Sequence, residues 1–521
     1  LSYLTIFSLV FSSVMINTAN AAVIDPGDGV TVTFADELGD GSNTQLAPGD
    51  DYLLDEAGLT FNTHGGQMVF RNLTITNDNA TRVLTVTDGT GGNNEVATMS
   101  GNISFTADGA TDANINLTTG SLTVQGNVLT DASGNKVDFG IDSNQVLDLS
   151  GTVTASINAF NGDNEGEVKI SGATTYVGAI GATANRTVAN LNVDDTLTLG
   201  DNTSIVVNTL DLDGTIVSAV AGGTTNTLTV DTTSNFAAAA AINTAGNQVY
   251  TGAVTLAADS TLVATANSTS GNITFGGAVG GQFDLSATGT LVTFTGTVGD
   301  TNDIDNLAIV GNASFAADVE AESIDVSGTT ALTAVADLIK STGVLALDGT
   351  VTLAEVGNTN PFELKSVGAL TTGAIAGTAG NTAENLTLDA GAAGAINVGA
   401  VTIVTNLLID DANGATFASV NLLGNFTVTD LTDATTLTFT GDSVIAGDLV
   451  ANKGNDDYNI AILGDMTVTT AVAFENTGTL TIGNQTSDVS TFTGGLVATA
   501  PSAISLAGTL TTGTTNTMTL G

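Results

Sequence analysis

One short pattern of residues recurs along the chain, and a repeat constrains the fold more than any other sequence feature. Its four copies are Leu147-Asp-Leu-Ser-Gly-Thr-Val153, Leu210-Asp-Leu-Asp-Gly-Thr-Ile216, Leu345-Ala-Leu-Asp-Gly-Thr-Val351 and Ile504-Ser-Leu-Ala-Gly-Thr-Leu510. In each copy apolar residues alternate with other residues, a glycine marks a turn, and a β-branched or aliphatic residue starts the next apolar run. The pattern therefore predicts short β-strands joined at tight corners.

The spacing of the copies indicates the size of the repeating unit. Their glycines lie at positions 151, 214, 349 and 508, and each separation is near a multiple of roughly 20 to 23 residues. A second phrase, an Asn-Leu step at Asn72, Asn190, Asn306 and Asn385, recurs at similar multiples. Units of this length are typical of solenoids, in which each coil contacts only its neighbours. We predict an all-β fold, a right-handed parallel β-helix or β-solenoid with coils of about 20 residues.

The composition agrees with stacked coils. The chain has 62 Gly, 4 Pro, no Trp and no Cys, and only 5% of its residues are aromatic. We expect columns of Val, Ile, Leu and Ala to form a narrow core, with Leu212 and Leu347 pointing inward. Threonine suits the outward strand positions because it is β-branched, while asparagine and glycine suit the corners.

The two ends of the chain differ from the repeats. Residues 1–21 contain an apolar run followed by Asn17-Thr-Ala-Asn-Ala21, which is typical of a secretory signal peptide, here without its basic start. Residues 22–60 carry Pro26, Pro48 and several acidic residues and are expected to cap the first coil. Residues 61–521 are predicted to be one continuous solenoid, open at the C-terminus and part of a truncated array. A transmembrane anchor is the alternative reading of the first segment.

The formal net charge of −45 restricts the possible partners. Nucleic acids and anionic membranes bind clusters of positive charge, so we expect neither to bind this segment. Carboxylates could collect Ca²⁺, but no dedicated calcium-loop spacing is present, and we predict at most non-specific Ca²⁺ and no cofactor. The candidate clusters are Asp300, Asp303 and Asp305; Asp163, Glu165 and Glu167; Asp410, Asp411 and Asn413; and Asp456 with Asp457.

Catalytic groups are scarce. The only histidine is His64, in a Thr-His-Gly-Gly stretch, and without cysteine this leaves little material for a histidine-dependent triad. Paired carboxylates can cleave polysaccharides, and the chain has Asp-Asp pairs at 194–195, 410–411 and 456–457. Only Lys453 lies near such a pair, and Lys453, Asp456, Asp457 and Tyr458 are expected to form a polar loop. We predict no enzyme activity and no individual catalytic, cofactor or metal residue.

Several segments resemble known surface proteins. Gln248-Val-Tyr-Thr-Gly-Ala-Val-Thr-Leu256, Gly271-Asn-Ile-Thr-Phe-Gly-Gly-Ala-Val-Gly-Gly281 and Val292-Thr-Phe-Thr-Gly-Thr-Val298 resemble the β-strand repeats of filamentous-haemagglutinin-like adhesins. The module of Gly296-Thr-Val-Gly299 with Asn306-Leu307 is similar to the passenger segments of rickettsial outer-membrane surface antigens, which are autotransporters. The resemblance implies an exported protein at a Gram-negative cell surface or outside the cell. The chain lacks the Asn-Pro-Asn-Gly motif of two-partner secretion.

Three functional classes follow from these features. The first is an adhesin or autotransporter passenger that forms a stalk and binds receptors or glycans of host or neighbouring cells. The second is an S-layer or extracellular-matrix subunit that associates laterally with the assistance of cations. The third, more remote, is a polysaccharide-acting β-helix enzyme. An outer-membrane barrel downstream, calcium-dependent lattice formation, or an acidic pair beside a basic residue would favour the first, second and third class respectively.

Overall fold

The structure is a computed structural model of the 521-residue chain. It describes residues 23–24, 31–33, 51–54, 59–62, 68–75, 82–87, 96–105, 112–131, 133–134, 136–219, 226–265, 270–300, 302–333, 338–354, 361–378, 384–451 and 457–521. The predicted signal peptide at 1–21 and most of the predicted cap at 22–60 lie outside these residues. Within them every regular element is a β-strand, and no described helix is long and apolar enough to cross a membrane.

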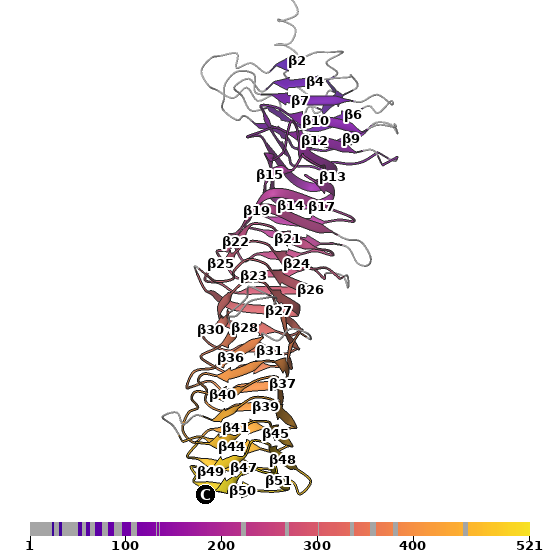
Figure 1. Ribbon diagram of the computed structural model, residues 1–521. Helices are drawn as coiled ribbons and strands as arrows, with labels where there is room; N and C mark the ends of the chain where they lie inside the picture. The colour runs from indigo at the N-terminus through magenta and orange to yellow at the C-terminus, as the bar shows by residue number, and fades with distance from the viewer. Residues whose placement is uncertain are drawn as a thin grey trace, which may run out of the picture. The chain divides into compact units, whose positions relative to one another are not determined.

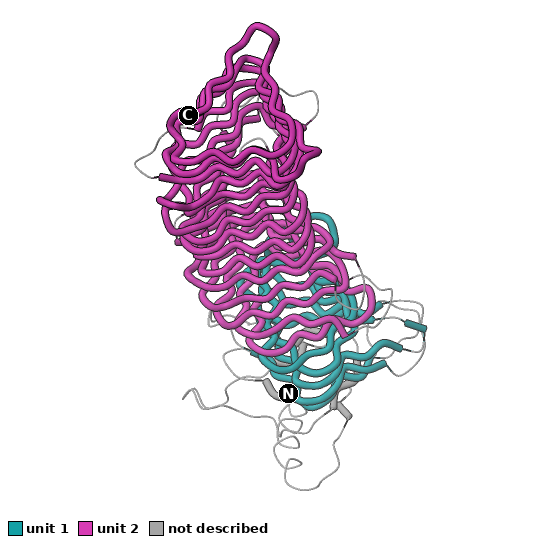
Figure 2. The backbone as a smooth tube through the Cα atoms, turned by 90° about the horizontal axis from the view of Figure 1, so that it is seen from below, with its two compact units in different colours: residues 1–191 teal, residues 192–521 magenta. Residues whose placement is uncertain are grey.

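The chain divides into two compact units, Leu1–Leu191 and Asn192–Gly521 (Figure 2). In each unit strands from successive coils pair side by side in parallel, as Figure 1 shows for the stacked arrows. The predicted all-β parallel β-solenoid is thereby confirmed, with about 17 turns and coils about 23 residues apart. Three strand positions recur in each coil, so the strands of a unit form three parallel series.

Unit 1 contains its three series in the following strands. One series is β2 (Thr31–Thr33), β4 (Leu59–Asn62), β7 (Val83–Thr87), β10 (Ala113–Leu117), β12 (Val137–Ile141) and the end of β13 (Val146–Ala159). The second is β5 (Met68–Phe70), β8 (Val96–Met99), β11 (Ser121–Val124) and the starts of β13 and β14 (Glu165–Ile180). The third includes β1 (Val23–Ile24), β3 (Asp51–Leu54), β6 (Asn72–Ile75) and β9 (Ile103–Phe105). The boundary between the units falls within β15 (Val188–Val193).

Unit 2 has three series that we call A, B and C. Series A contains β16 (Thr196–Leu199), β18 (Thr215–Ser218), β20 (Ala241–Asn243), β23 (Ser260–Val263), β26 (Leu285–Phe294), β27 (Ile304–Phe315), β28 (Val319–Val326), β31 (Leu345–Leu347), β34 (Leu370–Thr372), β37 (Ile396–Val404), β39 (Ala415–Leu422), β41 (Thr436–Phe439), β44 (Asn459–Ile462), β47 (Thr479–Ile482) and β50 (Ala503–Leu506). Series B shares β26, β27, β37 and β39 and adds β17 (Ser204–Leu212), β19 (Thr227–Phe236), β21 (Gln248–Tyr250), β24 (Ile273–Phe275), β29 (Thr330–Thr333), β32 (Val351–Ala354), β35 (Ile375–Gly377), β42 (Ser443–Ile445), β45 (Met466–Val468), β48 (Val489–Phe492) and β51 (Thr509–Thr512). Series C shares β17, β19 and β28 and adds β22 (Ala253–Leu256), β25 (Val279–Gly280), β30 (Leu338–Ser341), β33 (Phe362–Lys365), β36 (Asn385–Asp389), β38 (Asn406–Ile409), β40 (Phe426–Val428), β43 (Leu449–Ala451), β46 (Val472–Phe474), β49 (Leu496–Ala498) and β52 (Met518–Leu520).

The coils keep their register although their lengths differ. In series A, Leu307 pairs with Ile324 after 17 residues, whereas Leu370 pairs with Ile396 after 26 residues. Strands that turn a corner absorb single extra residues in bulges, as at Thr402 and Val404 of β37. Because side chains alternate between the two faces of a strand, this constant register keeps the same side of every strand facing the core.

Columns of apolar side chains in consecutive coils form the core. In series A the column runs through Ile309, Val326 and Leu347, each no more than 1% exposed. Leu212 is also fully buried, so the two residues predicted to point inward do so. Stacking supplies this burial: Leu506, in the last coil, has a neighbouring coil on one side only and is 50% exposed, whereas its partner Ile482 is 2% exposed.

Series B contains an aromatic column that the sparse aromatic composition did not suggest. The rings of Tyr250, Phe275, Phe294 and Phe315 follow one another on β21, β24, β26 and β27, and all four side chains are buried. Their consecutive ring centroids are 5.4, 4.8 and 5.4 Å apart in stacked geometry. These separations match the distance between adjacent parallel strands of about 4.8 Å, so the coil spacing itself places the rings in stacking range.

Glycines form ladders where adjacent corners approach closely. Gly311, Gly328, Gly349 and Gly373 follow one another in successive coils. A methyl group placed on Gly349 would lie 2.3 Å from the carbonyl oxygen of Gly328, and one on Gly373 would lie 2.4 Å from that of Gly349. Both contacts are with backbone, which cannot swing away. The glycine of the repeated pattern is therefore required because no side chain fits between the coils.

Candidate functional site

Many acidic and amide side chains lie at the corners and bind the next coil. In one ladder of unit 2, the Asn425 N–H donates to Asn406 Oδ1 and the Asp448 N–H donates to Asn425 Oδ1, both at 2.8 Å. In another, the Asp465 N–H donates to Asp442 Oδ1 at 3.1 Å. A corner carboxylate thus satisfies a backbone donor that has left the strand ladder. Part of the negative charge serves to fasten consecutive coils.

The predicted cluster of Asp163, Glu165 and Glu167 serves the local backbone instead. Asp163 Oδ1 accepts the Thr187 N–H at 2.8 Å, and Glu165 Oε2 accepts the Asn161 N–H at 2.9 Å. Asp300 and Asp303 are exposed and Asp305 is partly exposed. In the part of the chain that the structure describes, no three His, Asp or Glu side chains come close enough together to hold a metal ion.

The Asp-Asp pairs have similarly ordinary surroundings. Asp195 Oδ1 accepts the N–H of Thr196, Asp410 is exposed, and the Asn413 N–H donates to the Gly394 carbonyl oxygen at 2.7 Å. Asp457 accepts a hydrogen bond from the Thr477 hydroxyl. None of the ion pairs found among the described residues joins one of these aspartates to a lysine or arginine.

Three of the predicted loop and site residues, His64, Lys453 and Asp456, lie outside the described residues. Tyr458 differs from the expected polar loop because its side chain is fully buried. Burial, with smaller contributions from the charges of Asp430 and Glu475, raises the pKa of the Tyr458 hydroxyl well above its ordinary value. Tyr458 is therefore a core residue.

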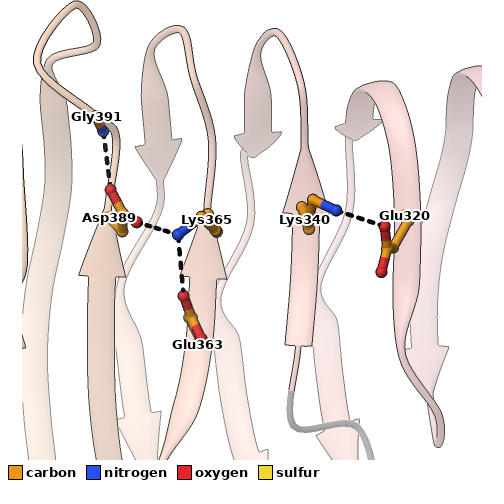
Figure 3. A network of polar contacts seen from close by, with 6 residues as sticks. All are labelled: Glu320, Lys340, Glu363, Lys365, Asp389 and Gly391. Carbon is orange, nitrogen blue, oxygen red and sulfur yellow. Dashed lines mark hydrogen bonds and ion pairs between the residues drawn. The ribbon is translucent and has the colours of Figure 1, made fainter.

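A charge ladder crosses series C and contains two of the eight basic residues of the chain (Figure 3). It consists of Glu320, Lys340, Glu363, Lys365 and Asp389. Glu320, Lys340, Lys365 and Asp389 are in register on four successive strands. Lys340 Nζ lies 2.6 Å from Glu320 Oε2, and Lys365 Nζ lies 3.6 Å from Glu363 Oε1 and contacts Asp389 Oδ2 directly.

The charge ladder contains its own counter-charges. Asp389 is 9% exposed and its Oδ1 also accepts the Gly391 N–H at 2.9 Å. The hydrogen bond to Asp389 is the main reason why the pKa of Lys365 lies above its ordinary value. Lys365 is 39% exposed, and exposed pairs of this kind stabilise a protein by at most about 1 kcal/mol each. The arrangement aligns coils and leaves neither lysine free to attract an anion.

The outward row of series B carries no charged residue. In register from β17 to β51 it contains Val206, Thr229, Val249, Thr274, Thr293, Ser314, Ala331, Thr352, Ala376, Thr402, Asn421, Val444, Thr467, Thr491 and Thr511. All of these side chains are small or medium-sized and all are at least partly exposed. Unit 2 thus has an uncharged stripe although the whole chain has a net charge of −45.

Cavities on the described surface are shallow and open. One depression of about 530 Å³ lies over β22 and β25 and is lined by Thr255, Ala257, Gly280 and Gln282 among others, with no charged group. A second, of about 360 Å³, lies over β36, β38 and β40 beside Asn385, Asn406 and Asn425. Neither brings together a nucleophile and a base, so neither has the makings of a catalytic site.

Sequence reasoning missed both the charge ladder and the uncharged stripe. The members of the ladder are about one coil apart in sequence, so only a correct coil length brings them together. A register drawn from the confirmed repeat would have placed Lys340 beside Lys365. Comparison of the chain with protein-family models, with curated proteins and with solved structures finds no match.

Proposed function

We propose that the chain is an exported structural repeat protein, which forms the stalk of a cell-surface adhesin or autotransporter passenger. The observation that carries this proposal is the division of labour within each coil. The inward residues form continuous apolar columns, the corners bind the next coil, and the outward rows are small and largely uncharged. Every class of residue thus serves stacking, which is what a spacer requires.

The support for an adhesin in particular comes from the sequence. The resemblance to filamentous-haemagglutinin-like repeats and to rickettsial passengers implies a parallel β-solenoid, and the chain has that fold. The apolar run and Ala-rich segment at 1–21 favour export. On this proposal binding specificity belongs to the loops between strands, and the coils hold them away from the cell surface.

The test combines location with length. Antibodies raised against unit 2 should label intact cells of the source organism, and protease added outside the cells should remove the label. A deletion of residues 419–441, which joins β39 to β41 one coil later in register, should leave a displayed and shorter protein. Binding to host or neighbouring cells should then fall with each further coil removed. Antigen that is found only inside intact cells would contradict the proposal.

A second function is favoured by the uncharged stripe. Two copies with a net charge of −45 repel one another wherever their acidic corners meet, and the stripe is where the charge is lowest. This supports the alternative of an S-layer or matrix subunit that associates laterally, with cations screening the corners. Sedimentation of the purified chain should then show Ca²⁺-dependent assembly, and Thr402→Asp in the stripe should abolish it while Thr371→Asp in series A should not.

A further inference from the structure

Glu384 is a carboxylate placed in the core. It lies at the start of β36 and its side chain is fully buried. Glu384 Oε1 accepts the Thr378 N–H at 2.9 Å, whereas Oε2 has no hydrogen-bond partner. Glu384 takes part in none of the ion pairs among the described residues. Buried carboxylates are normally paired with a positive charge or bound to a metal ion, because an isolated buried charge is very costly.

The surrounding column explains how this side chain finds room. The inward column of series B passes through Phe315, Leu332 and Leu353 and then reaches Gly377, which has no side chain. A methyl group on Gly377 would lie 3.2 Å from Glu384 Oε2. The carboxyl group therefore borders the space where an apolar side chain stands in the preceding coils.

A second oxygen faces the same space. The carbonyl oxygen of Ile403, one coil later, lies 2.2 Å from the point where the Gly377 Cβ would be. Ile403 has a φ of +60°, and the register of β37 shifts beside it. A left-handed conformation is rare for a β-branched residue and marks a strained position that its surroundings must compensate.

The two oxygens are therefore at most about 5.4 Å apart, which is the sum of their distances from the Gly377 Cβ point. Both are acceptors, so neither can donate a hydrogen bond to the other. Two oxygens on one Ca²⁺ ion lie up to about 5 Å apart, because each is about 2.3 to 2.6 Å from the metal. The negative field of the whole chain favours a cation at this position.

We propose that Glu384 Oε2 and the Ile403 carbonyl oxygen hold a single Ca²⁺ ion within the coil stack, beside Gly377. This site is distinct from the acidic corners, where carboxylates are exposed and accept backbone N–H groups. The ion would neutralise the buried charge and offset the strain at Ile403. It would also join the coil of Gly377 to the coil of Ile403, so stacking at this level would depend on calcium.

The experiment compares the chelator-treated full-length chain with the Glu384→Gln variant, which keeps the shape of the side chain and removes its charge. We expect CaCl₂, at constant ionic strength, to raise the unfolding temperature of the wild type progressively and to leave that of Glu384→Gln unchanged. Isothermal titration with CaCl₂ should show one tight site fewer in the variant. Glu363→Gln is the matched control, since it removes an exposed carboxylate of the preceding coil, and it should retain the wild-type response.

Two results would overturn the proposal. An equal response to CaCl₂ in the wild type and in Glu384→Gln would show that the exposed acids bind all the calcium. A wild type that ignores CaCl₂ but gains stability as the pH falls would show that a proton neutralises the carboxyl group. If Glu384→Gln fails to fold, Glu384→Asp provides the test: it keeps the charge but withdraws it by one methylene, and it should bind Ca²⁺ at least tenfold more weakly.

Discussion

The substitution Gly349→Ala tests whether the corner glycines are selected by close contact between coils. The added methyl group would lie 2.3 Å from the carbonyl oxygen of Gly328 and 2.6 Å from its carbonyl carbon. Because Gly349 does not have a positive φ, backbone strain does not enter the comparison. Overpacking of this kind typically costs about 1–3 kcal/mol, and both clashing atoms are backbone, so we expect the upper part of that range.

Gly280→Ala is the matched control within the same unit. A methyl group there would have only one neighbour within 4 Å, the Asn302 carbonyl oxygen at 3.9 Å. Loss of glycine's freedom in the unfolded chain should then stabilise the protein by about 0.4–1 kcal/mol. Guanidinium unfolding followed by circular dichroism gives the sign of each change. Because a stack of repeats need not unfold in one step, hydrogen exchange of the amides near each site should locate it. Equal effects of the two substitutions would refute the steric explanation.

Three further predictions concern the core, the tyrosines and the charge ladder. Leu347→Asp should cost several kcal/mol because it buries an unpaired charge, whereas Thr352→Asp on the exposed stripe should stay within about 0.5 kcal/mol; similar losses of denaturation midpoint would mean that the register is wrong. Burial raises the pKa of Tyr176, Tyr250 and Tyr458 above the ordinary value of 10.0, so above pH 10 the unfolded chain releases these protons first and the folded state loses up to about 1.4 kcal/mol per pH unit for each tyrosine. Tyrosinate absorbance should therefore rise together with unfolding, and ionisation without loss of circular dichroism would contradict this. Lys365→Ala should lower stability more than Lys340→Ala, because Asp389 is 9% exposed and Glu320 is 29% exposed, with each loss near 1 kcal/mol or less; a reversed order in urea titrations would contradict it.

The sequence predicts the strands, the coil and the inward residues because these depend on local alternation and on the repeat length. Leu212 and Leu347 could be assigned from the pattern alone, since an inward position follows from its neighbours. The contacts between coils could not be assigned in this way. Coils of 17 and 26 residues occur in the same series, so an average repeat does not place Lys340 beside Lys365.

The roles of glycine and aspartate were the hardest to foresee. Glycine at a corner suggests a positive φ, but Gly349 is needed because a neighbouring carbonyl group leaves no room. Aspartate suggests solvation or metal binding, but Asp442 accepts an N–H from the following coil. Glu384 has no local signature at all, because its burial depends on a glycine seven residues earlier and on a bulge in the next coil.

The corner hydrogen bonds run in one direction along the chain. Asn102, Asn127, Asn406, Asn425 and Asp442 each accept an N–H from the coil that follows in sequence, and Asn226, which accepts from Thr203, is an exception. A finished coil therefore offers ready acceptors to the segment that comes after it. We expect the solenoid to assemble like a zipper from its N-terminal side, each coil serving as the template for the next. Folding of this kind can begin before the rest of the chain is available.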